Sequence, residues 1–327
     1  MSSRHSILLM RWLAYNEKLT VMKRILLFIS AAVMLVAVSC QKNQHTAEPS
    51  DLADVTFSID LPVAPTKAIG DGLSAVELYY AVFNQDGGYI NSLAQQQVVA
   101  VSGKKATVEL KLVRQYTYSI VFWAQAPGAP YTFTPATGTV AVDYSGDAND
   151  DLRDAFCALH KFTVPDAATF GETVTLTRPF AQINFGAADF APITELGLAV
   201  ESTVAFTGVA NQYNILKGTV SGEASTSFAA TTVPAQYATP ETLTVGTKDY
   251  AYVAMNYILA PISAQENKLA SITATFKYNG SSVVLNVPNV PYKRNYRTNI
   301  IGDLFTTDAT FNIVVDEAFL EPDFIVE

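Results

Sequence analysis

Apolar and polar residues alternate with a period of two in segment after segment of this chain. The alternation is clearest over 55–61 and 108–112, where every second residue is apolar. A period of two places those apolar side chains on one face of a β-strand. No long stretch follows the helical period, so the sequence predicts an all-β fold with little helix. Further strand-like segments lie at 77–83, 89–93, 116–124, 172–176, 181–185, 196–206, 250–259, 271–278 and 283–287.

Glycine, proline and asparagine separate these segments at regular spacing. The strongest hairpin signal is Asn279–Gly280, which lies between two strand-like segments. Regularly spaced strands with such turns are typical of β-sandwiches. We place a domain boundary at the Arg178–Pro179 junction. This boundary predicts an N-terminal β-sandwich over 53–178 and a C-terminal β-sandwich over 179–327.

Residues 1–39 have the pattern of a bacterial export signal. Two basic residues after Met22 precede an apolar run of 14 residues, and small residues then lead to Cys40. The run is short for a spanning helix, which needs about 20 residues. The small residues resemble a lipobox, so Cys40 is the predicted lipidation site and 40–52 a polar tether. A buried apolar segment with a chance cysteine is the alternative, and a start at Met1 or Met22 stays open.

Charge and cysteine content narrow the function classes. Removal of 1–39, which holds five basic residues and one acidic residue, changes the formal net charge from −9 to −13. An acidic chain without a basic patch is not expected to bind nucleic acid. Cys157 is the other cysteine of the mature chain, so no intrachain disulfide can form if Cys40 is lipidated.

Cys157 and His160 are the first candidates for site chemistry. Their spacing fits either a thiol with its base or half of a metal site. A metal site needs further ligands, and a cysteine nucleophile normally takes its base from elsewhere in the fold. A packed local turn is therefore favoured. The segment 150–160 is also the best short helix candidate, with Asp150 or Asp151 as N-cap.

An acidic loop is the second candidate. Asp147, Asn149 and Asp151 have the alternate spacing of a calcium loop. Leu152 stands where such a loop needs glycine, and Ala158 where it needs glutamate, so a solvated loop is favoured. No glycine-rich phosphate loop is present in the sequence. We expect no catalytic residue, no metal, no cofactor and no enzymatic activity.

Six short segments spread over the mature chain form a recognisable set. They are Lys67-Ala68-Ile69-Gly70-Asp71-Gly72, Phe122-Trp123-Ala124, Arg153-Asp154-Ala155-Phe156, Arg178-Pro179-Phe180-Ala181-Gln182-Ile183-Asn184, Ala254-Met255-Asn256-Tyr257 and Arg294-Asn295-Tyr296-Arg297-Thr298-Asn299. With these segments the chain resembles the fimbrillin-like lipoproteins of Bacteroidetes, the superfamily of FimA-type fimbrial subunits. None of the segments is a catalytic signature, so the resemblance concerns architecture more than role.

The resemblance implies two transthyretin-like β-sandwiches in tandem, exported as a lipoprotein. It also implies that a trypsin-like protease cuts after a basic residue in the loop that follows the first strand. Lys67 is the only basic residue between Lys42 and Lys104, so the implied cut lies between Lys67 and Ala68. A surface lysine without this role is the alternative.

Loss of the first strand would open a groove, which a C-terminal strand of a neighbouring subunit would fill. Such a strand satisfies unpaired backbone groups and covers apolar side chains. The implied displaced strand carries Val55, Phe57, Ile59 and Leu61, and the implied donor strand carries Phe311, Ile313, Val315, Phe319 and Phe324. The C-terminal alternation can equally be the last strand of its own domain.

The resemblance implies a structural or adhesive fimbrial subunit. Its expected partners are other fimbrial subunits, a trypsin-like maturation protease, the outer membrane through the lipid anchor, and a ligand on a host or bacterial surface. The expected location is the cell outer membrane and then the fimbrium, with the stalk, anchor or tip role left open. The alternative is a surface glycan-binding lipoprotein of a nutrient-uptake system, with Tyr131, Phe133 and Tyr144 in predicted loops and Trp123 in the core.

Overall fold

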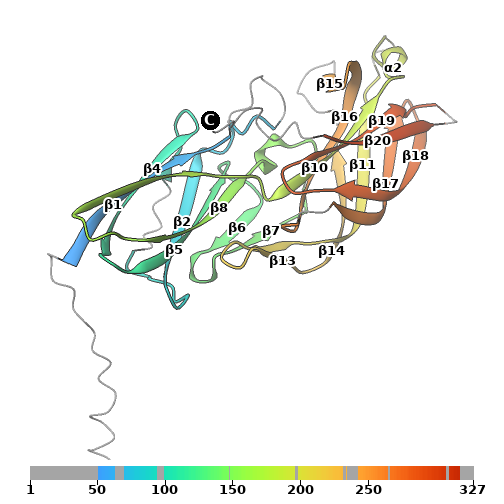
Figure 1. Ribbon diagram of the computed structural model, residues 1–327. Helices are drawn as coiled ribbons and strands as arrows, with labels where there is room; N and C mark the ends of the chain where they lie inside the picture. The colour runs from blue at the N-terminus through green and yellow to red at the C-terminus, as the bar shows by residue number, and fades with distance from the viewer. Residues whose placement is uncertain are drawn as a thin grey trace, which may run out of the picture. The chain divides into compact units, whose positions relative to one another are not determined.

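Strands dominate the described part of the chain, where helix is limited to one five-residue α-helix and short 3-10 turns (Figure 1). The computed structural model describes residues 51–62, 70–93, 99–146, 148–195, 198–230, 233, 242–263, 266–306 and 309–316. Its sheets have the character of β-sandwiches, which confirms the predicted all-β fold. None of the helices in these ranges is long and apolar enough to cross a membrane.

The strands before residue 176 form two sheets with the orders β4-β1-β9 and β3-β2-β5-β8. Strand β1 pairs antiparallel with β4 and parallel with β9, whereas all pairs of the second sheet are antiparallel. The strand bounds are β1 Leu52–Asp60, β2 Glu77–Asn84, β3 Val99–Ala100, β4 Lys105–Val113, β5 Thr117–Gln125, β8 Phe156–Thr163 and β9 Thr169–Thr175.

The strands after residue 179 form two further sheets, with the orders β15-β16-β10-β19-β20 and β14-β11-β17-β18. Strand β10 pairs antiparallel with β16 and parallel with β19. The bounds are β10 Phe180–Ala187, α2 Ala191–Glu195, β11 Glu201–Val209, β14 Ala224–Ala230, β15 Thr242–Val245, β16 Lys248–Leu259, β17 Asn267–Tyr278, β18 Ser281–Tyr292, β19 Arg297–Asp303 and β20 Thr310–Asp316.

The second set of sheets repeats the first in order and direction. The order β4-β1-β9 corresponds to β16-β10-β19, and β3-β2-β5-β8 corresponds to β14-β11-β17-β18. Within the described residues, β15 and β20 are additions at the two edges of the repeated sheet. The first set of strands ends with β9 and the second begins with β10. The domain boundary predicted from the sequence lies between these two strands. The division into two domains itself stays a prediction.

A fifth sheet is shared by the two sets of strands. Its order is β13-β12-β7-β6, so β12 pairs with β7 across more than 60 residues of sequence. The 3-10 turn η2 lies between β6 and β7. The bounds are β6 Tyr131–Thr134, η2 Pro135–Thr137, β7 Thr139–Val142, β12 Gln212–Asn214 and β13 Thr219–Ser221.

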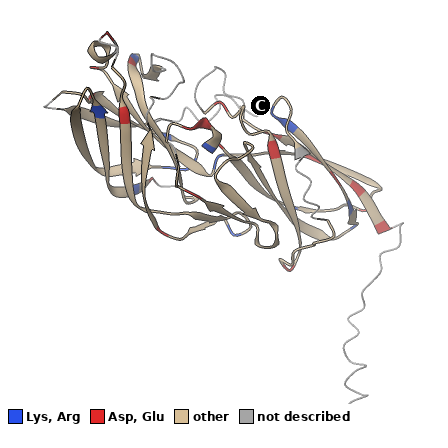
Figure 2. Ribbon diagram, turned by 180° about the vertical axis from the view of Figure 1, so that it is seen from behind, with Lys and Arg blue, Asp and Glu red and all other residues tan. Residues whose placement is uncertain are grey.

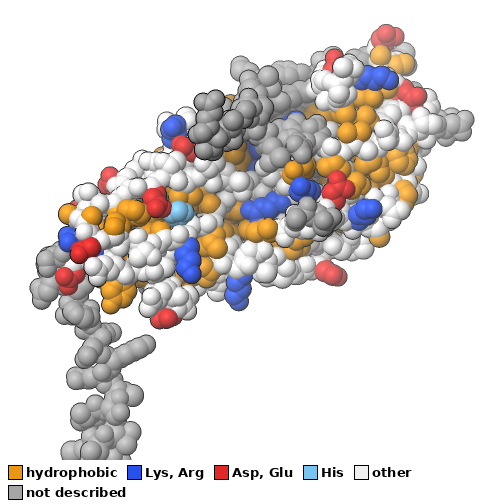
Figure 3. Space-filling model, in the orientation of Figure 1, with side chains coloured by type: hydrophobic (Ala, Val, Ile, Leu, Met, Phe, Trp, Pro, Cys, Tyr) orange, Lys and Arg blue, Asp and Glu red, His pale blue; other side chains and the backbone are white. Residues whose placement is uncertain are grey.

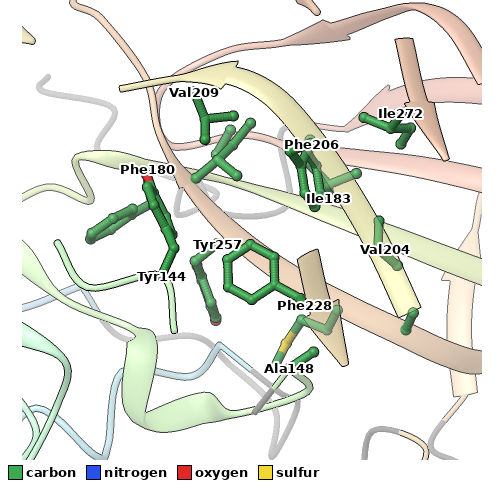
Figure 4. Close-up of a cluster of buried hydrophobic side chains, with 14 of the residues drawn as sticks. Tyr144, Ala148, Phe180, Ile183, Val204, Phe206, Val209, Phe228, Tyr257 and Ile272 are labelled. Carbon is green, nitrogen blue, oxygen red and sulfur yellow. The ribbon is translucent and has the colours of Figure 1, made fainter. Parts of the chain in front are cut away.

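Two hydrophobic clusters lie between the layers. The smaller one consists of residues up to Leu176 and includes the inward side of β1. The larger one joins both sets of strands, because Trp123 and Val140 belong to it together with Phe180, Phe228 and Phe276. Figure 4 shows part of this second cluster, in which aromatic rings from β10, β14 and β16 point toward one another.

Two of the predicted elements are wrong. The segment 150–160 is a 3-10 turn, η3 (Asp151–Arg153), followed by strand β8, although Asp150 is the N-cap and its side chain accepts from Leu152 N at 2.9 Å. The segment 89–93 is not a strand, since only Tyr89 makes a single bridge. The hairpin at Asn279–Gly280 is confirmed. These two residues have φ of 46° and 74° and connect β17 to β18, which pair antiparallel.

Candidate functional site

Strand β1 is the middle strand of its sheet. Val55 lies opposite Leu110 of β4 and Phe170 of β9, and the ladder continues in both directions along the strand. The inward side chains Ala53, Val55, Phe57, Ile59 and Leu61 are each no more than 3% exposed. The predicted alternation of β1 is thus present, and the strand is a full part of the core.

Phe57 occupies the centre of this inward face. Its ring meets Phe162 at 4.9 Å, His160 at 5.8 Å and Phe122 at 6.0 Å between centroids, in edge-to-face geometry. Such aromatic pairs add about 0.5–1.5 kcal/mol each beyond the buried area. The space under β1 is therefore lined by rings from β5 and β8.

Cys157 and His160 do not form a joint site. They lie on opposite faces of β8, because three positions along a strand invert the face. His160 contacts Glu172 of β9 through Nε2. Cys157 is buried, burial raises the pKa of its thiol, and Arg294 donates to its Sγ at 3.1 Å. The predicted packed local turn is wrong as well, because the segment is a strand.

Both ends of the connection between β1 and β2 meet the side chain of Lys104. This residue precedes β4, has a φ of 63° and is 8% exposed. Its ammonium donates to the carbonyl of Pro62 at 2.9 Å and to that of Asp71. Its own carbonyl accepts from Leu61 N at 2.9 Å. A single buried lysine therefore binds the chain before and after 63–69.

At Gly70 the chain is held by two charged side chains. Arg178 Nη2 donates to the Gly70 carbonyl, and Gly70 N donates to Asp151 Oδ1 at 2.7 Å. Arg178 also contacts Asp154 at two points, 2.7 and 2.9 Å, and the two side chains are 3% and 0% exposed. Ser74 Oγ donates to the Asp151 carbonyl at 3.1 Å. The turn after 63–69 is thus attached to buried charges.

The Asp151 carboxyl has unusual electrostatics. Burial raises its pKa to about 7, and the charges of Asp154 and Asp71 add to the rise, while a backbone N–H and Arg178 act in the opposite direction. The Tyr257 hydroxyl lies 3.4 Å from Asp151 Oδ1. Asp151 can therefore change its charge near neutral pH.

Strand β20 is the outermost strand of its sheet within the described residues. It pairs antiparallel with β19, and Ile313 and Val314 pack against the larger core. Phe311 is 37% exposed and Val315 is half-buried, so its alternating face is incompletely covered. A Cβ atom on Gly302 of β19 would lie 2.0 Å from the carbonyl of the first β20 residue. Glycine there allows β20 to approach.

The remaining predicted site residues lie outside the described residues. They are Cys40, Lys67, Ala68, Phe319 and Phe324. Of the calcium-loop residues, Asn149 accepts from Met255 N at 2.7 Å. The described residues contain no cluster of three or more metal-ligating side chains.

The aromatic residues considered for glycan contact do not form a surface platform. Tyr131 and Tyr144 are 9% and 5% exposed, and their hydroxyls donate to the carbonyls of Arg153 and Ala210. Phe133 is half-buried. The prediction that these rings lie in loops is wrong for Tyr131 and Phe133, which belong to β6.

A hollow of about 550 Å³ lies over β7 and β12. Asn214 lines it, but its amide already donates to Thr137 O and Thr139 Oγ1, at 3.1 Å each, and accepts from Lys217 N. Figure 3 shows charged side chains of both signs scattered over one face of the protein, and the ribbon in Figure 2 shows the positions of Lys, Arg, Asp and Glu dispersed along the chain. Neither the hollow nor the charge distribution singles out a ligand.

Comparisons with solved structures concern the fold. A candidate cell adhesion protein from Bacteroides uniformis has a TM-score of 0.50 at 12% identity, covering 83% of this chain and 100% of its own. The tip fimbrial protein Mfa3 from Porphyromonas gingivalis has 0.45 at 10%, covering 81% and 99%. A fimbrial assembly protein from Parabacteroides distasonis has 0.43 at 14%, covering 81% and 99%.

The predicted likeness to surface proteins of Bacteroidetes is thus confirmed for the fold by the Bacteroides uniformis adhesion protein. No curated protein matches the sequence. A family model matches over 48–326, which is most of the chain. The chain therefore belongs to the family of unknown function DUF6562.

Proposed function

We propose that this protein is a structural and adhesive subunit of a surface fimbria. It is exported as a lipoprotein through Cys40, cut between Lys67 and Ala68 by a trypsin-like protease, and assembled by donor-strand exchange. In the exchange, β1 leaves its sheet and the β20 segment of a neighbouring subunit takes its place. The fold shared with the Bacteroides uniformis adhesion protein supports this role.

The observation that carries the proposal is the placement of β1 and β20. Strand β1 is a central strand at the beginning of the folded chain, and the predicted cut lies just after it. Within the described residues, β20 has no counterpart in the first set of strands, so the repeated sheet orders are complete without it. The predicted cut would thus separate β1, and β20 is an additional strand near the C-terminal end.

Energetics require exchange rather than simple release. Burial of one large apolar side chain contributes about 1.5–3 kcal/mol, and β1 buries Val55, Phe57, Ile59 and Leu61. Its departure would also leave β4 and β9 with unpaired backbone groups. A donor strand has to arrive as β1 leaves.

The donor strand has to match the inward face of β1. Phe311, Ile313 and Val315 provide three alternating apolar residues, against four inward positions in β1 and a fifth at Leu61 just after it. Filling the groove therefore requires residues beyond Asp316, where Phe319 and Phe324 stand in the sequence. Apolar side chains at alternate positions supply specificity in this mode of recognition, and backbone hydrogen bonds supply affinity.

The test is assembly of the purified chain after limited cleavage with a trypsin-like protease. We expect Ala68 as the new N-terminus and a ladder of stable oligomers on unheated gels. Lys67→Gln should remain monomeric under the same treatment, and Ile313→Asp should be cut normally but form no ladder. A cleaved wild-type chain that stays monomeric at high concentration contradicts the proposal.

A further inference from the structure

The two ends of the β1–β2 connection are held unequally. On the upstream side, the Pro62 carbonyl accepts from Lys104 Nζ and Leu61 N donates to the Lys104 carbonyl, at 2.9 Å each. On the downstream side, Lys104 also binds the carbonyl of Asp71, and Gly70 is bound at both its N–H and its carbonyl. The bonds from Lys104 and Arg178 have charged donors, which makes such hydrogen bonds about twice as strong as neutral ones.

The downstream turn also fits closely onto the body of the protein. Gly72 has a φ of 73°, and a Cβ atom there would lie 2.7 Å from the ring of Phe156. The Arg178 guanidinium lies over the same ring, with its Cζ 4.6 Å from the ring centroid. Ser74 adds a hydrogen bond to the Asp151 carbonyl at 3.1 Å. The turn is therefore shaped to rest on Arg178 and its neighbours.

We propose that Asp151, Arg178 and Lys104 form an anchor that keeps the chain from Gly70 onward in place when the connection before it is cut. Everything upstream of the cut, including β1, can then leave as one piece, while the turn from Gly70 to Ser74 stays bound to Asp151 and Arg178. The role of the anchor rests on the proposed strand exchange. The contacts that form the anchor are present in the uncut chain and can be tested there.

The anchor responds to pH through Asp151. The groups facing this carboxyl are Asp154, Asp71, Arg178 and Tyr257. While the turn at Gly70 is bound to Asp151, which is the closed form, the pKa of the Asp151 carboxyl is about 7. When the turn opens, water reaches this carboxyl and its pKa returns toward about 3.9. Between these values the closed form binds a proton that the open form lacks. Raising the pH through this range therefore makes opening easier.

The test is hydrogen exchange of the full chain, followed by mass spectrometry of peptides covering 70–76. Asp151→Ala, which removes the acceptor of Gly70 N–H, should lower protection of this segment at least tenfold. Asp151→Asn keeps an acceptor oxygen and should retain protection. Wild type should be about tenfold more protected at pH 6 than at pH 8, after correction for intrinsic exchange, and Asp151→Asn should show no such difference. Glu109→Gln, exposed on β4, is the matched control.

The second arm cuts the connection, either at Lys67 or at an inserted recognition sequence for another protease. We expect 70–76 to keep its protection within about threefold after the cut. Loss of protection at 70–76 after the cut contradicts the anchor, whether or not oligomers form. If ladders still form, strand exchange stands without the anchor. Retained protection without any ladder supports the anchor and counts against strand exchange. An Asp151→Ala chain as protected as wild type also overturns the anchor.

Discussion

The Arg178–Asp154 pair is the most deeply buried charge pair among the described residues. Arg178 binds both carboxylate oxygens of Asp154 and also the Gly70 carbonyl. The pair therefore connects three segments at the point where the first set of strands ends and the second begins. A buried ion pair is weak evidence of net stabilisation, but removal of one partner leaves an uncompensated charge. The pair therefore makes these segments depend on one another.

We expect Arg178→Met to lower the free energy of unfolding by about 3–5 kcal/mol, measured by urea denaturation. The double variant Arg178→Met with Asp154→Leu should lose less than the sum of the single variants. Lys111→Met is the control, because the Lys111–Asp54 pair is 69% and 63% exposed and should contribute less than about 1 kcal/mol. Equal effects at the two pairs would contradict this account.

At the residue level, the sequence predicted what depends on local chemistry. Asp150 caps a turn as expected, and the alternation of β1 is observed. The roles of Lys104 and Asp151 were missed, because their partners lie far away along the chain, for example 81 residues between Gly70 and Asp151. Arg178 belonged to a recognised segment, but no local pattern shows that its side chain is buried.

At the scale of single elements, strand β8 shows how periodicity misleads. Phe156, Cys157 and Leu159 have spacings that suit a helix, and a cap precedes them. In the structure Cys157 packs into the larger cluster and Phe156 into the smaller one, so both faces near the start of β8 are buried. A strand buried on both faces loses its alternation. Short strands such as β12 and β13 are too brief for any period to be read.

Gly302 controls the attachment of β20. Gly302→Ala should displace β20 from β19, because the added Cβ would lie 2.0 Å from a backbone oxygen. We expect protection of the β20 amides against hydrogen exchange to fall at least tenfold, with β10 unchanged, and ladders to form faster after cleavage. Gly171→Ala is the control, since its Cβ meets only ordinary contacts at 3.5 Å. Unchanged β20 protection would refute this role of Gly302.

At the scale of the whole molecule, the repeat of sheet orders is the feature that the sequence conceals. The two sets of strands share pairing direction and order, yet β6, β7, β12 and β13 interrupt them at different points. Sandwich folds tolerate many sequences provided that inward positions stay apolar. Architecture is therefore repeated without recognisable repetition of residues.

The burial of β1 predicts the behaviour of the cut molecule. After cleavage at Lys67, the β1 fragment should stay bound and elute with the body in size-exclusion chromatography without denaturant, because its ladders and core contacts are intact. An excess of a peptide spanning 310–327 should speed its release. Phe57→Ala, which removes the central ring contacts, should release it without the peptide. Spontaneous dissociation of the wild-type fragment would exclude the exchange mechanism.

Strand β10 has the same neighbours in the second set as β1 has in the first, but it cannot be freed in the same way. The connection from β10 to β11, which corresponds to the β1–β2 connection of the first set, contains no lysine or arginine. A trypsin-like protease therefore has no basic residue to cut after at the position in the second set that corresponds to Lys67. In the proposed assembly each subunit then binds two neighbours. It accepts a strand from one neighbour in its vacant groove and donates its own terminal strand to the other. Growth is unbranched and has a direction, and a subunit without a free terminal strand ends the filament.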